Sequence, residues 1–479
     1  MRATSSISRI EFKLPLTREE AERIFALGQE AAVFVMLELS RLAGQDALQW
    51  SPSTPSGMVP VYAKPPASKR ARTPGAKPGH PGSRREKPPE ITRREEHPPM
   101  TQCPVCGGAL GAPTERRFRL IEEIVETQPE VTEHSIPRHW CPKCRKLVEP
   151  PVLDALPKAQ FGHRLVTLSA WLHYGLGVTI SQVLEVFGRS MQFEITPGGL
   201  VDAWQRLAGI LEPWHEQIAE AVKRGGVLHA DETGWRVNGR THWLWCFTTS
   251  RATYYMIDRS RGSPALSKFF TEAFDGVLVT DFWAAYNAVE CAARQACLPH
   301  LFRELEKVDQ EDDTPTWGAF RKKLKRLLRD AVRLGAERAG LSAEGLPAGW
   351  QAGFASRRAL LDRRRDELLA APWDNVNARR LIKRLRRYCD ALFTFLDHVD
   401  VPCDNNRAER EIRPAVIIRK NSLGNRSENG AQVQAVLMSI YRTLKLRGHD
   451  PLKTLVNALK DYVRTGSLPP LPDAATSEG

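Results

Sequence analysis

The sequence lacks the features that mark membrane, secreted or disulfide-stabilised proteins. It contains no run of about 18 uncharged apolar residues, the length that a transmembrane helix needs, and its first residues, Met1 to Ser5, lead into polar sequence rather than into the apolar core of a secretion signal. Its nine cysteines are odd in number, and four of them form two Cys-x-x-Cys pairs. This spacing is typical of metal binding in a reducing compartment, so we expect a cytoplasmic protein.

An excess of acidic residues is absent as well. The chain has 69 Lys and Arg against 56 Asp and Glu, a formal net charge of +13. A basic surface favours a polyanionic partner, because cationic side chains that neutralise phosphates release condensed counterions. With 479 residues, of which 42% are hydrophobic, the chain can form two to four domains with cores of their own.

The order of patterns along the chain predicts a multidomain α+β protein. Its expected centre is a ribonuclease-H-like catalytic core with an all-α insertion, preceded by a zinc ribbon and a helical DNA-binding region. The predicted segments are an N-terminal helix (1–50), a flexible basic linker (51–97), a zinc ribbon (98–150), a helical and possible helix-turn-helix-like region (151–222), the first part of the core (223–303), the helical insertion (304–400), the final core helices (401–465) and a disordered tail (466–479).

Several N-terminal patterns leave two interpretations open. A capping-box pattern at Thr17 and Glu20 and a broad apolar stripe predict a helix to Leu42, which pairs with a second copy or packs on its own domain. The Pro- and Gly-rich basic linker either follows DNA phosphates or is a solvated tether. Helix starts at Thr179 and at Thr196-Pro197 fit a helix-turn-helix-like pair or two ordinary packed helices.

From residue 227 onward the period of the hydrophobic pattern changes to that of strands. We predict three antiparallel strands with an Asn238-Gly239 hairpin turn, a helix from Ser263 to about Phe274, and a short apolar strand that ends at Asp281. This order is the opening of a ribonuclease-H-like fold. Later helices are expected over Arg321–Arg338, Ala378–Leu396, Val433–Arg447 and Asp450 to about Val463.

The two cysteine pairs predict a structural zinc site. They are separated by 34 residues (107 to 140), and each pair can place two thiolates on one tetrahedral Zn²⁺ ion. The alternating segment Phe118 to Thr132 is expected to supply the strands of the ribbon. Four sulfur ligands leave no open position for a substrate, so one structural ion is predicted on Cys103, Cys106, Cys141 and Cys144.

Carboxylates at strand ends predict a second kind of metal site. Asp231 lies in the first core strand and Asp281 ends the fourth, and these strands are neighbours in the expected fold. Two hard divalent cations on oxygen ligands can promote phosphoryl transfer, whereas a lone Asp at a strand end is more often a cap. A third acid is required from a later helix.

The third acid is expected in the segment from Cys403 to Pro414. Asp404 is a suitable N-cap, which places Asn406 and Glu409 on one helical face and directs Glu411 elsewhere. Periodicity alone favours Glu409 over Glu411 only modestly.

These motifs, taken together, resemble the transposases of the insertion-sequence-66 family. The matching stretches run in one order from about residue 75 to residue 465, and they include Gly75–Gly82, the two cysteine pairs, His229–Thr233, Val279–Tyr286, Leu298–Arg303, Asp404–Arg410, Ile412–Pro414, Arg419–Asn421 and Gly430-Ala431. The resemblance implies that Asp231, Asp281 and Glu409 form a catalytic triad that binds two Mg²⁺ or Mn²⁺ ions. It also implies a bacterial, nucleoid-associated enzyme.

The resemblance also suggests contacts with DNA, each with a simpler alternative. His300 and Arg303 would lie beside the active site, although His300 could equally be a core histidine. Arg413, Arg419 and Lys420 would contact DNA phosphates, or they form a solvated basic face. The expected partners are element ends and target DNA, a second or further copies of the chain, and accessory proteins of the same element.

The expected activity is metal-dependent cleavage of DNA at the ends of an insertion sequence, followed by strand transfer to target DNA. Two other functions fit parts of the sequence: a non-catalytic zinc-ribbon regulator that binds DNA, and a ribonuclease-H-fold resolvase or nuclease that cuts without joining. The presence of all three carboxylates argues against the regulator, and the helical insertion and zinc ribbon favour the transposase.

Overall fold

The computed structural model describes residues 90–341 and 349–475, together with Glu19, Glu22, Phe25, Ala26, Gly28 and Met36. Apart from those six positions, the predicted helix of residues 17–42 lies outside the described residues, as do residues 51–89 of the linker and 476–479 of the tail. The chain divides into two units, residues 1–61, 134–184 and 195–479 in one and residues 62–133 and 185–194 in the other. Within the described ranges, no helix combines the length and apolar character that a membrane crossing requires.

The centre of the larger unit is a mixed five-stranded sheet with the strand order β5-β4-β3-β6-β7. The first three strands are antiparallel neighbours, whereas β6 is parallel to β3 and β7 is parallel to β6. Their bounds are β3 (Val227–Val237), β4 (Arg240–Thr248), β5 (Thr253–Asp258), β6 (Phe274–Thr280) and β7 (Cys291–Ala296). The hairpin between β3 and β4 turns at Asn238 and Gly239, both with positive φ (48° and 72°), as the sequence predicts for this turn.

In the sheet region one predicted helix ends earlier than expected, and one strand was not predicted. The helix expected to reach Phe274 ends earlier, as α6 (Ser263–Phe269), because Phe274 already begins β6 and packs near Phe270. Strand β7 was not predicted, since its sequence, CAARQA, contains no β-branched or aromatic residue. Its pairing with β6 therefore comes from tertiary context rather than from local preference.

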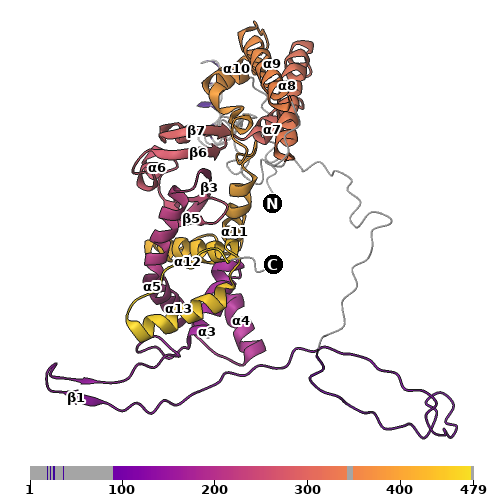
Figure 1. Cartoon of the computed structure of the whole chain (residues 1–479), viewed down its shortest axis with the longest axis vertical. Helices are drawn as coiled ribbons and strands as arrows, with labels where there is room; N and C mark the ends of the chain where they lie inside the picture. Colours follow the sequence, from indigo (N-terminus) through magenta and orange to yellow (C-terminus); the bar gives the residue numbers. More distant parts are fainter. Residues whose placement is uncertain are drawn as a thin grey trace. The chain divides into compact units, whose positions relative to one another are not determined.

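Long helices pack against the sheet and fix its antiparallel half. Helices α5 (Pro197–Lys223) and α12 (Glu428–Leu446) contact each other and β5, and Figure 1 shows them beside the sheet. Ser439 and Thr443 of α12 accept hydrogen bonds from the backbone N–H groups of Tyr255 (2.9 Å) and Thr253 (3.1 Å). Side-chain hydroxyls thus satisfy donors that the edge strand β5 leaves unpaired.

The starts of helices α5 and α13 (Pro451–Thr465) agree with the caps predicted at Thr196 and Asp450. Thr196 caps α5 by accepting the Gly199 N–H, and Asp450 caps α13. A π-helical turn, Trp171–Gly175, follows α3 (His163–Ala170), and α4 spans Ile180–Met191. Helices therefore lie where the helix-turn-helix-like pair is expected, and its role in binding DNA stays a prediction.

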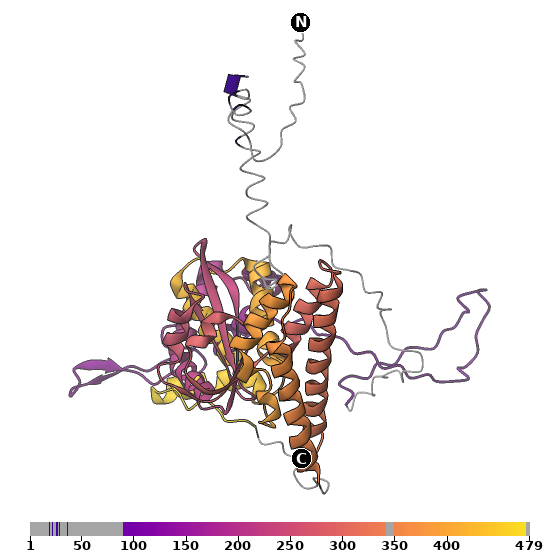
Figure 2. The same cartoon turned by 90° about the horizontal axis from the view of Figure 1, so that it is seen from above.

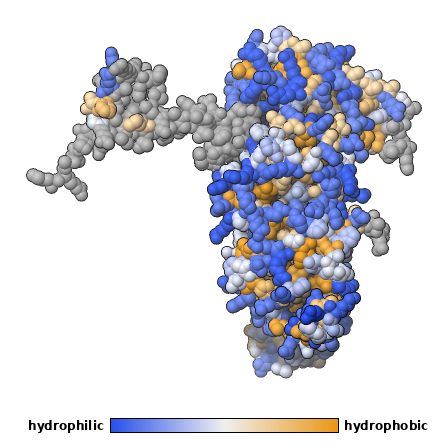
Figure 3. Space-filling model, turned by 90° about the vertical axis from the view of Figure 1, so that its left-hand side faces the viewer, coloured by the Kyte–Doolittle hydropathy of each residue, from blue (hydrophilic) through white to orange (hydrophobic). Residues whose placement is uncertain are grey.

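Between β7 and α11, the described residues form helices and short 3-10 turns but no strand. The helices are α7 (Leu298–Val308), α8 (Pro315–Ala339), α9 (Trp350–Ala370) and α10 (Val376–Arg387). In both views α8, α9 and α10 lie side by side (Figures 1 and 2). Their apolar faces form one buried cluster, centred on residues such as Trp317, Phe320 and Leu381. On the face drawn in Figure 3, hydrophilic residues predominate around small hydrophobic groups.

The segment between the cysteine pairs does not form the predicted strands. Residues 118–132 have no regular structure, and their apolar side chains are exposed, with Phe118 at 87% and Val131 at 93%. An alternating pattern produces a strand only where a partner and a core cover its apolar face. A hairpin forms instead around the second pair, from β1 (His139–Cys141) and β2 (Lys146–Val148).

A short loop after α11 (Asn406–Ser422) attaches this helix to the sheet. Asn425 forms an isolated parallel β-bridge with Val237 at the end of β3. Its N–H donates to Arg236 O (2.9 Å), and its carbonyl accepts from Asn238 N–H (2.9 Å). Trp235 Nε1 donates to Asn425 Oδ1 at 2.7 Å. Gly424 permits this approach, because it has φ +119° and a Cβ there would overlap the Arg236 carbonyl.

We predict that Gly424→Ala destabilises the protein. The positive φ alone costs an L-residue about 1–3 kcal/mol, and the overlap with the β3 backbone adds to this. The midpoint of thermal unfolding should therefore fall by several degrees. Gly353→Ala is the matched control, because Gly353 is exposed in α9 with free space around it, and there alanine should be neutral or stabilising. Equal midpoints for the two variants would contradict this account of the loop.

Candidate active site

Asp231 lies in β3, and Asp281 directly follows β6, the parallel neighbour of β3. The register pairs His229 of β3 with Val279 of β6, and each aspartate follows two residues later. Because side chains two residues apart share one face of a strand, both carboxyl groups point to the same side of the sheet. Backbone N–H groups orient them: Glu232 N donates to Asp231 Oδ1 (2.9 Å) and Trp283 N to Asp281 Oδ1 (2.8 Å).

The pKa values of both aspartates are raised. Burial is the main cause for Asp231, with further contributions from the charges of Glu232, Asp281 and Glu409, which leave its pKa well above the ordinary value. Burial and the charge of Glu232 raise the pKa of Asp281 to about 7. The contributions of Asp281 and Glu409 to Asp231 mean that three acids from distant parts of the chain lie near one another.

Neighbouring buried acids each have an arginine partner, whereas these two aspartates have none. Glu232 pairs with Arg261 (2.9 Å), Glu411 with Arg442 (2.7 Å) and Glu304 with Arg384. Within the described ranges, neither Asp231 nor Asp281 forms an ion pair. Two acids that remain uncompensated in a partly buried place mark a functional site more often than a structural one.

Glu232 is a part of the site that the sequence analysis missed. Its side chain is only 2% exposed, and it accepts hydrogen bonds from Arg261 and from Tyr286 Oη (2.7 Å). The Arg261 guanidinium lies over the rings of Trp243 (4.4 Å) and Trp283 (4.1 Å). The available signal was the acidic pair Asp231-Glu232 in one strand, whose side chains point to opposite faces.

Glu409 enters from the first turn of α11, as predicted from its helical face. The N-cap is Asn405 rather than the predicted Asp404; Asp404 Oδ1 instead accepts the Asn406 N–H (2.9 Å). The capping prediction is therefore wrong by one residue, because Asp404 closes a turn before the helix. Glu411 is directed elsewhere and pairs with Arg442.

Asn405 ties the start of α11 to the strand that carries Asp231. Its side chain is 1% exposed; Nδ2 donates to the Ala230 carbonyl (2.8 Å), and Oδ1 lies 3.1 Å from His229 Nδ1. Its backbone N–H donates to Cys297 Sγ (3.2 Å). One buried amide thus fixes Glu409, four residues later, relative to Asp231.

His300 and Arg303 of α7 lie beside Glu409, where the sequence analysis expected them. Arg303 Nη2 donates to Glu409 Oε1 at 2.9 Å, and His300 Nε2 is 3.9 Å from the same oxygen. Burial and the charge of Arg303 lower the pKa of His300 to about 4, so its ring is neutral at neutral pH. Burial also raises the pKa of the Cys297 thiol to about 12.

The other basic candidates have different surroundings. Arg413 and Lys420 are exposed on α11, so their predicted contacts with DNA phosphates stay open. Arg419 is half-buried, and its Nη1 donates to Thr233 Oγ1 (3.0 Å) and Gly234 O (2.6 Å) of β3. In this conformation Arg419 holds α11 against the sheet.

Each cysteine pair forms a tight turn of its own. Gly107 N–H donates to Cys103 O (2.8 Å), and Cys144 N–H approaches Cys141 Sγ at 3.4 Å. Hydrogen bonds within each turn lower the pKa of Cys103 and Cys141, which favours the thiolate that a metal requires. The first pair belongs to the smaller unit and the second to the larger.

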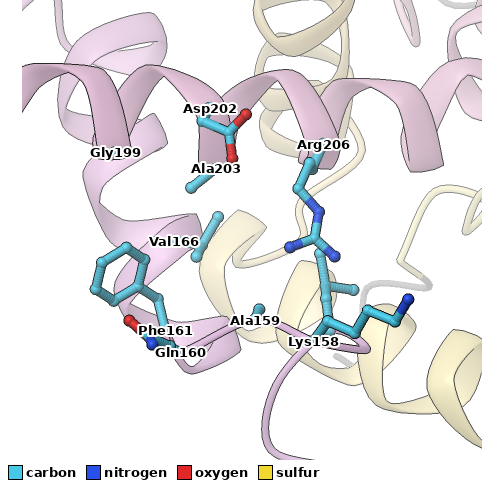
Figure 4. A pocket seen from close by; sticks show the side chains of 10 residues that line it. Lys158, Ala159, Gln160, Phe161, Val166, Gly199, Asp202, Ala203 and Arg206 are labelled. Atoms are coloured by element: carbon cyan, nitrogen blue, oxygen red, sulfur yellow. The ribbon is translucent and has the colours of Figure 1, made fainter.

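A pocket of about 230 Å³ lies away from these residues, between α3, α5 and the loop before α3. Figure 4 shows Lys158, Arg206 and Asp202 at its rim. Arg206 Nη2 donates to the Pro157 carbonyl at 2.8 Å. The pocket contains none of the predicted site residues.

Two family models match the chain. Residues 158–433 match the transposase domain of the DDE class that defines the transposase IS66 family, and residues 100–145 match the zinc-finger binding domain of transposase IS66. The fold and the acidic site thus occur in a transposase domain. Because the first match covers more than half of the chain, the chain belongs to the transposase IS66 family.

Curated relatives come from Sinorhizobium fredii. The uncharacterized protein y4qI is 28% identical over 299 residues, and the match covers 54% of this chain and 52% of that protein. The uncharacterized protein y4jD is 24% identical over 408 residues, which cover 76% of this chain and 75% of that protein. The chain thus spans about half the length of the first relative and three quarters of the second.

We predict that Asn405→Ala lowers stability by more than a typical surface change. The substitution leaves the Ala230 carbonyl and the His229 ring without their partner, and each buried unsatisfied group costs about 1–3 kcal/mol. Urea or thermal denaturation measures the loss. Asn406→Ala is the matched control, since Asn406 is exposed one residue later. A stability loss no greater than that of the control would refute the role assigned to this amide.

Proposed function

We propose that this transposase cleaves DNA strands at the ends of its insertion sequence and joins them to target DNA, with Asp231, Asp281 and Glu409 as its catalytic carboxylates. The observation that carries the proposal is the approach of three acids from β3, β6 and α11. Asp231 and Asp281 each follow by two residues the paired residues His229 and Val279 of the neighbouring strands. The charges of Asp281 and Glu409 contribute to the raised pKa of Asp231.

The sheet supports the proposal of a ribonuclease-H-like core. Three antiparallel strands are followed by a crossover helix and by two parallel strands, in the order β5-β4-β3-β6-β7. Asp231 lies in β3 and Asp281 directly follows its parallel neighbour β6, and the helices between β7 and α11 form the insertion. We infer that this insertion separates the second carboxylate from the third along the chain without separating them in space.

The donor set fits Mg²⁺ or Mn²⁺. Carboxylate oxygens are the ligands that these hard cations prefer, and burial together with neighbouring acidic groups raises the pKa values of Asp231 and Asp281. Two such ions, when bound, stabilise the attacking and leaving oxygens of an in-line phosphoryl displacement. No covalent attachment of DNA to the protein is required.

The chain's own residues would position the reacting groups. Backbone N–H groups orient one oxygen of each aspartate, which leaves the second oxygen to bind. Asn405 fixes the position of Glu409. We infer that the exposed Arg413 and Lys420 hold DNA phosphates, because cationic side chains next to an acidic site keep a polyanion in place. Oligomers on DNA and accessory proteins belong to the same proposal.

The four paired cysteines are proposed to hold one structural Zn²⁺ ion. The match to a zinc-finger domain over residues 100–145 includes all four, and the turn geometry and lowered pKa values favour thiolate ligands. Tetrahedral coordination by four sulfurs would link the two turns that flank residues 118–132, which have no regular structure of their own.

We predict that Asp281→Asn abolishes Mg²⁺-dependent cleavage of element-end DNA while DNA binding is retained. The amide is isosteric but lacks the charge that holds a divalent ion. Cleavage on gels and binding by mobility shift measure the two properties. Asp275→Asn is the matched control, because Asp275 is exposed in β6, the strand that directly precedes Asp281.

The metal-free protein gives a second readout for this variant. At pH 8 the wild-type Asp281, with its pKa of about 7, is mostly ionised although burial and the charge of Glu232 disfavour its charged form, so removal of the charge should raise the unfolding midpoint. Added Mg²⁺ should then stabilise the wild type and the control but not Asp281→Asn. Cleavage by the variant at the wild-type rate would contradict the assignment of Asp281 as a catalytic carboxylate. DNA binding without cleavage by the wild type would indicate a regulator.

We predict that Cys144→Ser removes the tightly bound zinc and lowers DNA binding. The loss of one of four thiolates opens the tetrahedral shell. Metal analysis of the purified proteins should find about one zinc ion per chain in the wild type and much less in the variant. Cys291→Ser is the control, because Cys291 lies at the start of β7, outside both pairs. Equal zinc contents in the two variants would contradict the four-cysteine site.

A further inference from the structure

A second set of metal-ligand side chains adjoins the acidic site. Cys297, His300 and Glu409 each offer one donor atom, and the three atoms lie within 4.8 Å of one another. Cys297 is the N-cap of α7 and His300 lies in its first turn, so the Cys-x-x-His spacing places both on one side of the helix start. Glu409 approaches them from the first turn of α11.

The donors of this set differ from those of the carboxylate site. A sulfur, an imidazole nitrogen and one carboxylate oxygen suit Zn²⁺ and similar borderline cations, whereas Mg²⁺ prefers oxygen ligands only. We propose that Cys297, His300 and Glu409 form a separate Zn²⁺ site with an open fourth position. Zinc bonds are about 2.0–2.3 Å long, so side-chain movements of about an ångström suffice to close the site.

A cation already occupies this position in the structure. The guanidinium of Arg303 lies 2.9 Å from Glu409 Oε1 and 3.2 Å from His300 Nε2. The Arg303 side chain is 52% exposed, so it can leave toward solvent when a metal ion enters. The N–H of Asn405 points at Cys297 Sγ (3.2 Å), and this donor stabilises the thiolate that forms when zinc displaces the thiol proton to solvent.

Glu409 belongs to both the carboxylate set and the zinc set, so metal binding by one set affects DNA cleavage by the other. This step rests on the proposed function, in which Glu409 completes the Mg²⁺ site. A Zn²⁺ ion held by Cys297 and His300 would retain Glu409 and withdraw it from the two aspartates. Zinc binding therefore inhibits DNA cleavage, and the protein carries an inhibitory metal site next to its catalytic one.

The test uses full-length protein that retains its tightly bound zinc. Added Co²⁺ serves as the probe, because a cobalt–thiolate bond gives a charge-transfer absorption that an all-oxygen site cannot produce. The wild type and the control Cys291→Ser should bind one further Co²⁺ ion with this absorption. Cys297→Ser should lose the absorption, and His300→Gln should weaken binding by at least the ~10–100-fold that loss of an outer-shell partner costs.

Activity is measured separately. For each protein we determine the concentration of added zinc that halves the cleavage rate, relative to the rate of the same protein without added zinc. Cys297→Ser should require at least about tenfold more zinc than Cys291→Ser, a shift of about 1.4 kcal/mol. An absence of thiolate-bound Co²⁺ in the wild type, or the same absorption in folded Cys297→Ser, would overturn the proposal; if that variant does not fold, His300→Gln decides. A wild type that does not cleave DNA refutes the proposed function but leaves the cobalt result intact.

Discussion

Like charges that share a partly buried place repel one another, and the fold must hold them there against that repulsion. In this member of the transposase IS66 family the constraint falls on Asp231, Asp281 and Glu409. The backbone hydrogen bonds between β3 and β6 fix the register of the two aspartates, and the buried amide of Asn405 fixes the helix that carries Glu409. Neither device depends on the charges themselves. The scaffold therefore keeps the acids together whether or not a cation is bound.

The surroundings show which acids the fold neutralises. Glu232, Glu304 and Glu411 are as buried as the aspartates, yet each faces an arginine. Such pairs stabilise little, but removal of one partner is costly, so they serve to hold elements in register. Asp231 and Asp281 lack such a partner and have raised pKa values instead. That difference distinguishes acids available for a metal from acids used for packing.

Local sequence patterns could predict the part of the fold that depends on local interactions. The β3–β4 hairpin follows from Asn238-Gly239 and from alternation, and Asp450 and Thr196 mark helix starts by their own hydrogen bonds. Strand β7 could not be predicted, because its Ala-rich sequence becomes a strand only beside β6. Residues 118–132 show the converse, an alternating pattern with no partner. The role of Asn405 was equally hidden, since its contacts with His229 and Ala230 span about 175 positions.

Glu409 differs from the two aspartates in a way that bears on how the site is completed. It is the member of the three that has a cationic partner, and that partner, Arg303, lies on a long and half-exposed side chain. The exposed ion pair contributes little net stability, so an incoming metal ion displaces it at small cost. Asp231 is held in a strand and Asp281 directly after one, whereas Glu409, the proposed third ligand, is held by a cation that can be replaced. Which cation replaces it depends on the neighbouring donors: oxygen atoms of Asp231 and Asp281 on one side, and the sulfur and nitrogen atoms of Cys297 and His300 on the other. Because Glu409 lies between the oxygen donors of the two aspartates and the sulfur and nitrogen donors of Cys297 and His300, we expect two kinds of metal ion to compete for its carboxylate.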